Sequence, residues 1–210
     1  MIRFLYADQL TQFQYLADTM YSDRAAQFKG RLDWKVDVDD RGQELDQYDR
    51  LNPLYVIAED RQGRHTGSLR FLPTIGRTMV NEHFTNLTDG VTIRSPLIWE
   101  CTRFCTAPGA AGGVSAALLL ASAELGLRFG LEQAVGVFDP RMPRIYGRIG
   151  WTPDVIGTGG EGRDRISVGL WTFSDSAREA ISRRSGIPLV TAAAWFDRSF
   201  GTPAPIAAAA

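Results

Sequence analysis

The segment SPLIWECTRFCT, residues 95–106, constrains the fold more than any other part of the sequence. Its apolar and aromatic residues predict a strand, yet Glu100 and Arg103 lie inside it. Because side chains alternate along a strand, these two are expected on opposite faces of the sheet. A charged side chain in a central strand must be paired or must face a cleft. The sequence therefore predicts a buried ion-pair network, a polar cleft beside this strand, or both.

The hydrophobic pattern around this strand predicts a mixed sheet flanked by helices, an α/β fold of the α+β type. Strands are expected at 53–60, 66–73, 95–106, 132–139 and 165–173. Helices are expected at 9–29, between Asp8 and Gly30, and at 114–130, 140–149 and 174–186, with a short helix or turn at 79–87. A turn is expected to lead into WTPDVIG, residues 151–157. This order is not the alternating pattern of a nucleotide-binding fold, and no GxGxxG motif follows a strand.

The composition limits the class of protein. The 210 residues are 44% hydrophobic and 22% charged, which is typical of one globular domain with a substantial core. We expect this domain to span residues 1–200 and the Ala/Pro-rich residues 201–210 to be a disordered tail. A net charge of −1 gives no nucleic-acid-binding footprint. We expect a cytoplasmic protein without membrane insertion, because no apolar run has transmembrane length and no signal peptide is recognisable.

The two cysteines, Cys101 and Cys105, are both expected on strand 95–106. Alternation puts them on the same face, too far apart along the strand to form a disulfide easily. His65 and His83 lie elsewhere in the chain, so no zinc site is predicted. We expect two reduced thiols and no metal.

The segment GQELDQYDRLNP, residues 42–53, gathers the carboxylates Glu44, Asp46 and Asp49. It contains too few apolar residues for a buried strand or an amphipathic helix. A solvated loop is the ordinary interpretation of such a segment. In the alternative interpretation the acids pair with arginines such as Arg70, or they face a cationic substrate and position its amine.

Two other segments have the features of anion-binding or acidic-partner sites. The loop APGAAGG, residues 107–113, precedes the helix at 114–130, and helix N-termini favour phosphate. Alternatively, it is only a flexible connection. Arg141, Arg144 and Arg148 recur at helical spacing, which suits either an acidic partner or a solvated helix face.

Four aromatic residues lie near the start of the chain: Phe28, Trp34, Tyr48 and Tyr55. They are expected in the core, and the alternative is that they stack on a flat or sulfonium-bearing ligand.

Together these features resemble the LuxI-type acyl-homoserine-lactone synthases, the autoinducer synthases of bacterial quorum sensing. The residues in the family's order and spacing are Arg24, Phe28, Trp34, Glu44, Asp46, Asp49, Arg70, Glu100 and Arg103. The later segment RIYGRIGW, residues 144–151, is also similar, and the resemblance covers residues 1–157.

The resemblance implies a GNAT-like acyltransferase fold, a twisted mixed β-sheet flanked by helices and opened in a V between two central strands. It implies a reaction in which an acyl group moves from acyl-carrier protein, or from acyl-CoA, to the amine of S-adenosylmethionine. Lactonisation then releases 5′-methylthioadenosine (MTA). S-adenosylmethionine is a substrate in this reaction, so no cofactor is expected, and we expect a monomer.

The resemblance also suggests roles for the residues around S-adenosylmethionine. Glu100 is the first choice of general base because burial raises a carboxyl pKa, and Glu44 is the second. Residues expected to bind S-adenosylmethionine are Arg24, Phe28, Trp34, Asp46, Asp49, Arg70, Arg103 and Phe104. Backbone N–H groups around residues 104–106 are expected to bind the oxyanion of the tetrahedral intermediate.

The acyl donor is expected to use other parts of the chain. Its acyl chain is expected to contact Leu118, Leu119, Val137, Phe138 and Ile149. Relatives that prefer 3-oxo chains carry a hydroxyl residue near Phe138, so Phe138 favours an unsubstituted chain. Arg141, Arg144 and Arg148 are expected to dock acyl-carrier protein. The loop at 107–113 does not match the pyrophosphate loop of acetyl-CoA-dependent GNAT enzymes, which also favours a carrier-protein donor.

Two other functions are compatible with the sequence. A GNAT-like N-acyltransferase acting on another amine would release no MTA. A non-catalytic ligand-binding homologue would bind its ligand without turnover.

Overall fold

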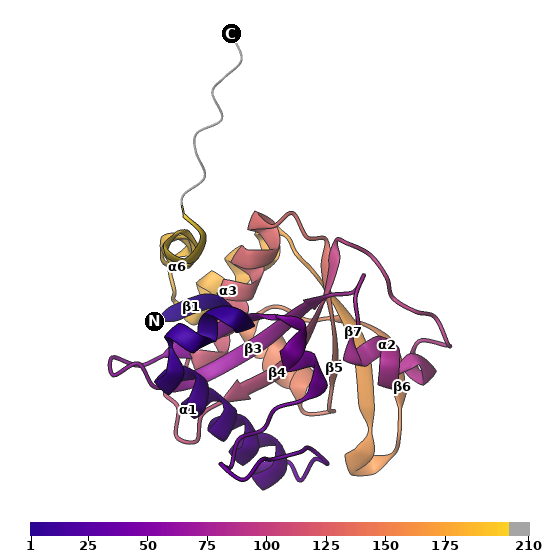
Figure 1. Cartoon of the computed structure of the whole chain (residues 1–210). Coiled ribbons are helices and arrows are strands. Elements are labelled where there is room, and N and C mark those ends of the chain that lie inside the picture. Colours follow the sequence, from indigo (N-terminus) through magenta and orange to yellow (C-terminus); the bar gives the residue numbers. More distant parts are fainter. Residues whose placement is uncertain (202–210) are drawn as a thin grey trace.

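The computed structural model describes residues 1–201, with the side chain of residue 163 left aside (Figure 1). Within them, seven strands form one sheet in the order β1-β2-β3-β4-β5-β7-β6. Neighbouring strands are antiparallel except β4 and β5, which are parallel. The strands are β1 (Ile2–Tyr6), β2 (Leu54–Glu59), β3 (His65–Pro73), β4 (Ile98–Thr106), β5 (Gln133–Phe138), β6 (Asp154–Gly159) and β7 (Ile166–Thr172). The predicted mixed sheet is confirmed.

Helices cover both faces of this sheet. They are α1 (Gln14–Ala25), α2 (Met79–His83), α3 (Val114–Arg128), α4 (Met142–Ile149), α5 (Asp175–Ser185) and α6 (Leu189–Phe200). The main core packs α3, α5 and α6 against the face that carries Leu54 and Val56 of β2. Tyr55 and Ile57 alternate with these residues and pack against α1 on the opposite face. In the part of the chain that the structure describes, no helix is long and apolar enough to cross a bilayer.

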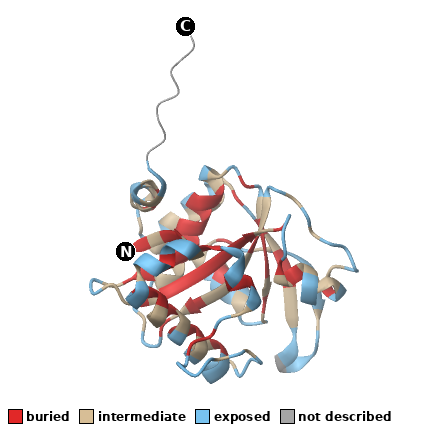
Figure 2. Ribbon diagram, in the orientation of Figure 1, coloured by how far each residue is buried: buried red, intermediate tan, exposed pale blue. Residues whose placement is uncertain are grey.

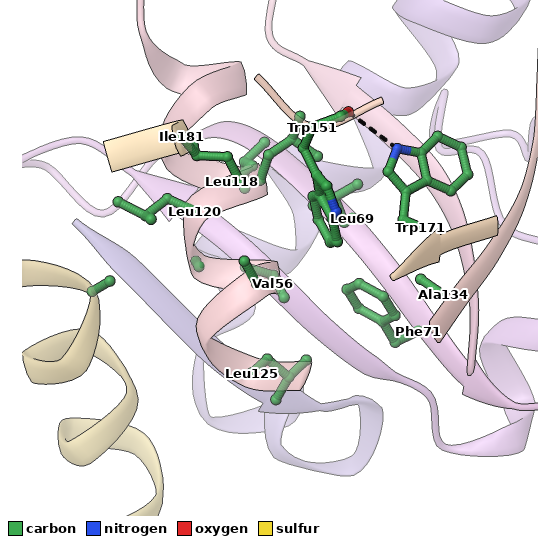
Figure 3. Packing of buried hydrophobic residues seen from close by; sticks show 14 of the residues in the cluster. Val56, Leu69, Phe71, Leu118, Leu120, Leu125, Ala134, Trp151, Trp171 and Ile181 are labelled. Atoms are coloured by element: carbon green, nitrogen blue, oxygen red, sulfur yellow. Dashed lines mark hydrogen bonds between the residues drawn. The ribbon is translucent and has the colours of Figure 1, made fainter. Parts of the chain in front are cut away.

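The main core forms one cluster on the face of the sheet that α3 covers. Figure 2 shows that buried residues concentrate in the central strands and α3. Leu118 and Leu125 of α3 lie in the same cluster as Leu69 and Phe71 of β3 (Figure 3). Burying a side chain of this kind stabilises the fold by roughly 1.5–3 kcal/mol. The indole of Trp171 on β7 donates a 3.3 Å hydrogen bond to the carbonyl oxygen of Trp151, which ties the end of α4 to the sheet.

Several element predictions were wrong or incomplete. The expected helix at 9–29 is a 3₁₀ helix (Ala7–Gln12), then α1, then a π-helix (Ala26–Arg31). The break falls at Phe13, whose φ of −128° and ψ of 50° lie outside the helical region. Strands β1 and β6 and helix α6 were not predicted. Strand β6 is an edge strand with two glycines and mostly exposed residues, so its composition resembles a turn. Residues 202–210 of the expected tail lie outside the described residues.

A β-bulge in β4 decides which side chains face the site. Ser68 pairs with Cys105, and Arg70 pairs with Thr102. Between these pairs, two residues of β4 oppose the single residue Leu69 of β3. One of the two is Arg103, whose φ is 54°.

The bulge contradicts the predicted alternation. Arg103 was expected on the face opposite Glu100, but it lies on the same face as Thr102. The contacts show this: Thr102 binds the Arg70 side chain, and both Arg70 and Arg103 bind Asp46. The two cysteines are therefore on opposite faces, although both are free as expected. Cys101 packs against the main core, and the Cys105 thiol lies 3.6 Å from a carbonyl oxygen of α1.

Strands β4 and β5 pair over a short distance only. Their register joins Ile98–Glu100 to Gln133–Val135. Beyond these residues β4 continues along β3, and β5 continues along β7. The sheet therefore opens between its two parallel strands.

Candidate active site

A cavity of about 560 Å³ lies at the opening between β4 and β5. This volume is within the range of small-molecule sites. Polar, charged and aromatic residues line one part: Phe28, Trp34, Glu44, Asp46, Tyr48, Thr102 and Arg103. Apolar and aromatic residues line the other: Leu69, Phe71, Leu119, Val137, Phe138, Tyr146 and Trp171. Leu69, Phe71 and Leu119 belong to the α3 side of the sheet, whereas Thr102 and Arg103 face the α1 side, so the cavity passes through the sheet.

Arg24 and Arg70 anchor an ion-pair network behind the charged part of the cavity. Both side chains are fully buried, and both bind Asp49. The Arg24 guanidinium is 3.0 Å from Asp49 Oδ2, and the Arg70 guanidinium is 2.7 Å from Asp49 Oδ1. Burial alone raises the pKa of Asp49, but these two cations outweigh it and hold that pKa well below its usual range. Asp49 therefore stays ionised at physiological pH.

Arg103 closes this network into a ring. Its Nη2 atom lies 2.9 Å from Glu44 Oε1 and 2.7 Å from Asp46 Oδ2. Glu44 also binds Arg24 at 2.6 Å, and Asp46 binds Arg70 at 2.5 Å. Each carboxylate thus joins two guanidinium groups, and cations alternate with anions around the ring. Leaving any member unpaired in this buried setting would be costly.

The acid cluster has its own local structure. Asp46 is the N-cap of the 3₁₀ helix Gln47–Leu51, and its Oδ1 accepts from the N–H groups of Tyr48 and Asp49 at 2.9 and 3.2 Å. In return, Asp49 Oδ2 accepts from the Asp46 N–H at 2.8 Å. This reciprocal cap turns both acids toward the arginines. The solvated-loop interpretation was wrong, since Glu44 is fully buried and Asp49 is 8% exposed.

Phe28 and Trp34 form a flat aromatic wall beside the ring of charges. Their ring centroids are 5.2 Å apart, and the rings are within 8° of parallel. The Arg103 guanidinium carbon lies 5.4 Å from the Phe28 centroid. Phe28 is buried and Trp34 is 41% exposed, so a ligand can reach the Trp34 ring. Such a wall suits a flat ring or a cation.

Glu100 is separate from the ring of charges. It is 1% exposed, and its carboxylate accepts hydrogen bonds from the N–H groups of Met79 (3.0 Å) and Val80 (2.5 Å). Burial raises its pKa to about 7 although these two amides favour the ionised form. A carboxyl group with this pKa can exchange a proton near neutral pH.

Comparison with known proteins identifies the family. The model of the autoinducer synthase family matches residues 8–181. The chain belongs to this family. The acyl-homoserine-lactone synthase of Rhizobium etli is 40% identical over 178 residues, which are 81% of this chain and 84% of that protein. The acyl-homoserine-lactone synthase of Agrobacterium fabrum is 31% identical and covers 69% of this chain and 72% of its own length.

Solved structures agree with the expected fold of this autoinducer synthase. The CoA-dependent acyl-homoserine-lactone synthase MesI is 25% identical, with a TM-score of 0.80 over 90% of this chain and 96% of MesI. An acyl-CoA N-acyltransferase from Pseudomonas aeruginosa has a TM-score of 0.54 at 16% identity, over 81% of this chain and 98% of its own. The predictions of the family and of the GNAT-like fold are confirmed, and the synthase is an acyltransferase.

The predicted acyl-chain residues of the synthase divide into two groups. Leu119, Val137 and Phe138 line the cavity, whereas Leu118 and Ile149 belong to the core and are not in the cavity wall. The sequence prediction did not include Met79, His83 and Phe84, or the cavity-lining residues Cys101, Ser122 and Met142. Their positions depend on how β4, α2, α3 and α4 are arranged around the opening, and no local motif marks them.

The remaining predicted residues lie near or outside the mouth of the cavity. Phe104 and Arg141 are in its wall, and Arg141 is held by Asp139 at 2.6 Å. Arg144 and Arg148 are exposed on α4, and neither forms an ion pair with another described residue. The loop at 107–113 leads into α3 through Gly113, the N-cap, as the sequence suggested.

Proposed function

We propose that this synthase transfers an acyl group from a thioester donor to the α-amine of S-adenosylmethionine and then forms the lactone, releasing MTA. The observation that carries the proposal is the cavity through the sheet, charged and aromatic in one part and apolar in the other. The relative TofI, solved with MTA and an inhibitor, is 27% identical with a TM-score of 0.70, which supports MTA as the product.

The charged part of the cavity has a complement for each charged group of S-adenosylmethionine. Asp46 and Arg103 are the most accessible members of the ring of charges, at 12% and 10% exposure. The α-ammonium group binds at Asp46 and the carboxylate binds Arg103, since each gains an opposite charge. The sulfonium and adenosyl groups pack on Phe28 and Trp34. Arg24, Arg70 and Asp49 hold the members of the ring that contact the substrate.

Glu100 accepts the proton of the α-ammonium group, directly or through one water. Glu44, Asp46 and Asp49 are each already held by two guanidinium groups in the ring of charges. Glu100 has no guanidinium partner among the described ion pairs and has a pKa of about 7. Glu44 is the second choice, because it lines the cavity.

The freed amine attacks the thioester carbonyl carbon, and the oxyanion is bound by backbone N–H groups of residues 104–106 beside the opening. The tetrahedral intermediate collapses by expelling the thiolate. The methionine carboxylate then attacks its own γ-carbon, and the carbon–sulfur bond breaks to give the lactone and MTA. The acyl chain lies against Leu119, Val137 and Phe138.

Acyl-carrier protein is our first choice of donor. The exposed Arg144 and Arg148 on α4 suit its acidic surface. Acyl-CoA is the second choice, because the relative MesI is CoA-dependent. We also propose that the synthase acts as a monomer.

The test offers S-adenosylmethionine and a panel of acyl thioesters, on carrier protein and on CoA, to the purified protein. Mass spectrometry should detect acyl-homoserine lactone and MTA in equal amounts. Glu100→Gln should remain folded and lose most of this activity, whereas Glu44→Gln tests the second choice of base. An acylated amine formed without MTA would overturn the proposal in favour of a general N-acyltransferase, and ligand binding without turnover would favour a non-catalytic homologue.

A further inference from the structure

Thr78 is a fully buried residue whose hydroxyl group has no hydrogen-bond partner among the described residues. Such groups are rare in folded proteins and call for an explanation. Thr78 directly precedes α2 as its N-cap residue, with φ −142° and ψ 151°. In this conformation a threonine hydroxyl normally accepts from the N–H of the second or third helical residue. Thr78 has the residue type and backbone of a cap without making the cap hydrogen bond.

Glu100 takes the place of this cap. Its carboxylate binds the N–H groups of Met79 and Val80, the first two residues of α2. Val80 is the second helical residue, which is one of the two partners that the Thr78 hydroxyl would ordinarily have. The Val80 amide at the start of α2 therefore has two possible acceptors, the Thr78 hydroxyl and the Glu100 carboxylate. It donates to Glu100, which comes from β4.

This arrangement bears on how Glu100 reaches a substrate. Glu100 is not in the cavity wall. Its neighbours are: the cavity is lined by Met79, whose N–H binds Glu100, and by Thr102 and Arg103, which follow Glu100 on β4. To meet an amine in the cavity, the carboxylate must turn away from α2. That turn would leave the Val80 amide buried and unpaired, which is unfavourable unless another acceptor replaces the carboxylate.

We propose that Thr78 is a positioning residue that caps α2 when the Glu100 carboxylate turns into the cavity to take the substrate proton. Rotation of the Thr78 side chain brings its hydroxyl to the Val80 amide as the carboxylate leaves. In the resting state the Thr78 hydroxyl therefore makes no hydrogen bond to another described residue and is available to cap α2. The inference rests on the proposed role of Glu100 and adds a residue that touches neither substrate.

The test compares Thr78→Val, which keeps the shape and removes the hydroxyl, with Thr78→Ser, which keeps the hydroxyl. Thr78→Val should lower kcat about tenfold, as expected for one lost hydrogen bond. Its KM for S-adenosylmethionine and its Tm should stay at the wild-type values, because the resting state does not use the hydroxyl. Thr78→Ser should restore kcat to within about twofold of wild type. In the Glu100→Gln background, Thr78→Val should have no further effect on the residual rate.

The possible failures are distinguishable. If Glu100→Gln keeps its activity, the proposed role of Glu100 is wrong, and the role of Thr78 is wrong with it. If Glu100→Gln is inactive while Thr78→Val keeps full kcat, only the inference about Thr78 is overturned. A Thr78→Val variant whose Tm and kcat fall together would show an ordinary structural role and would also overturn it.

Discussion

Replacing Glu100 by glutamine should change how the stability of the protein depends on pH. The pKa of Glu100 is raised by burial from 4.5 to about 7 in the folded protein. The folded state therefore keeps a proton that the unfolded state loses between these values. The resulting stabilisation is fully present below pH 4.5 and is lost as pH rises through 7. At about 1.4 kcal/mol per pKa unit, the loss amounts to about 3 kcal/mol. Glutamine does not titrate and removes this pH dependence.

The assay is urea unfolding of both proteins from pH 4.5 to pH 8. The wild-type free energy of unfolding minus that of Glu100→Gln should decrease by about 3 kcal/mol over this range, because other titrating groups largely cancel. Glu82→Gln is the matched control. Hydrogen bonds from Arg77 and Tyr48 lower the pKa of Glu82 from 4.5 to about 2, so its contribution is fully present above pH 4.5 and is lost as pH falls to about 2. Its difference from wild type should be constant above pH 5.

A constant difference for Glu100→Gln would refute the reasoning. It would mean that the Met79 and Val80 amides stabilise the carboxylate enough to offset its burial. Glu100 would then be ionised throughout, and the reason for preferring it to Glu44 as the base would disappear.

Three further predictions test other parts of the molecule. Arg144→Glu combined with Arg148→Glu should raise KM for acyl-carrier protein far more than it lowers kcat, and an unchanged KM would remove the docking role. Arg24→Ala should lower the free energy of unfolding by about 3–5 kcal/mol in urea, since it leaves two buried carboxylates short of a partner; a loss under about 1 kcal/mol would contradict the ring of charges. Gly136→Val should shift the products toward shorter acyl chains, because an added Cβ would lie 3.1 Å from the Cys101 carbonyl oxygen and 3.2 Å from the Trp171 ring, and all three residues line the cavity. Mass spectrometry with mixed donors measures this, and an unchanged distribution would place the chain elsewhere.

The sequence predicted which charged side chains come together better than it predicted their arrangement. Glu100 and Arg103 were recognised because charged residues in an apolar strand need partners. Glu44 was recognised in the acid cluster at 42–53, and the family resemblance added Arg24. The bulge was not predictable, because it arises from the register between β3 and β4 and not from β4 alone. It turned Arg103 to the opposite face and so allowed the ring to close.

Burial of the acid cluster at 42–53 was equally difficult to predict from the sequence. The two aspartates three residues apart could have predicted the reciprocal cap, since this spacing is typical of one. Their burial follows from arginines that are distant in sequence, so composition alone favoured a solvated loop. Residues of α2 joined the cavity wall by tertiary packing, for which a five-residue helix has no recognisable pattern.

The passage of the cavity through the sheet has a kinetic consequence. Two molecules that enter from opposite faces do not block each other, so neither must leave before the other arrives. In the proposed reaction both can be present at once, with the reacting amine and carbonyl meeting between β4 and β5. Initial-rate lines for the two substrates should then intersect, as in a ternary-complex mechanism, and should not run parallel as in a ping-pong exchange. A gap between two strands thus allows both substrates to bind before either product leaves.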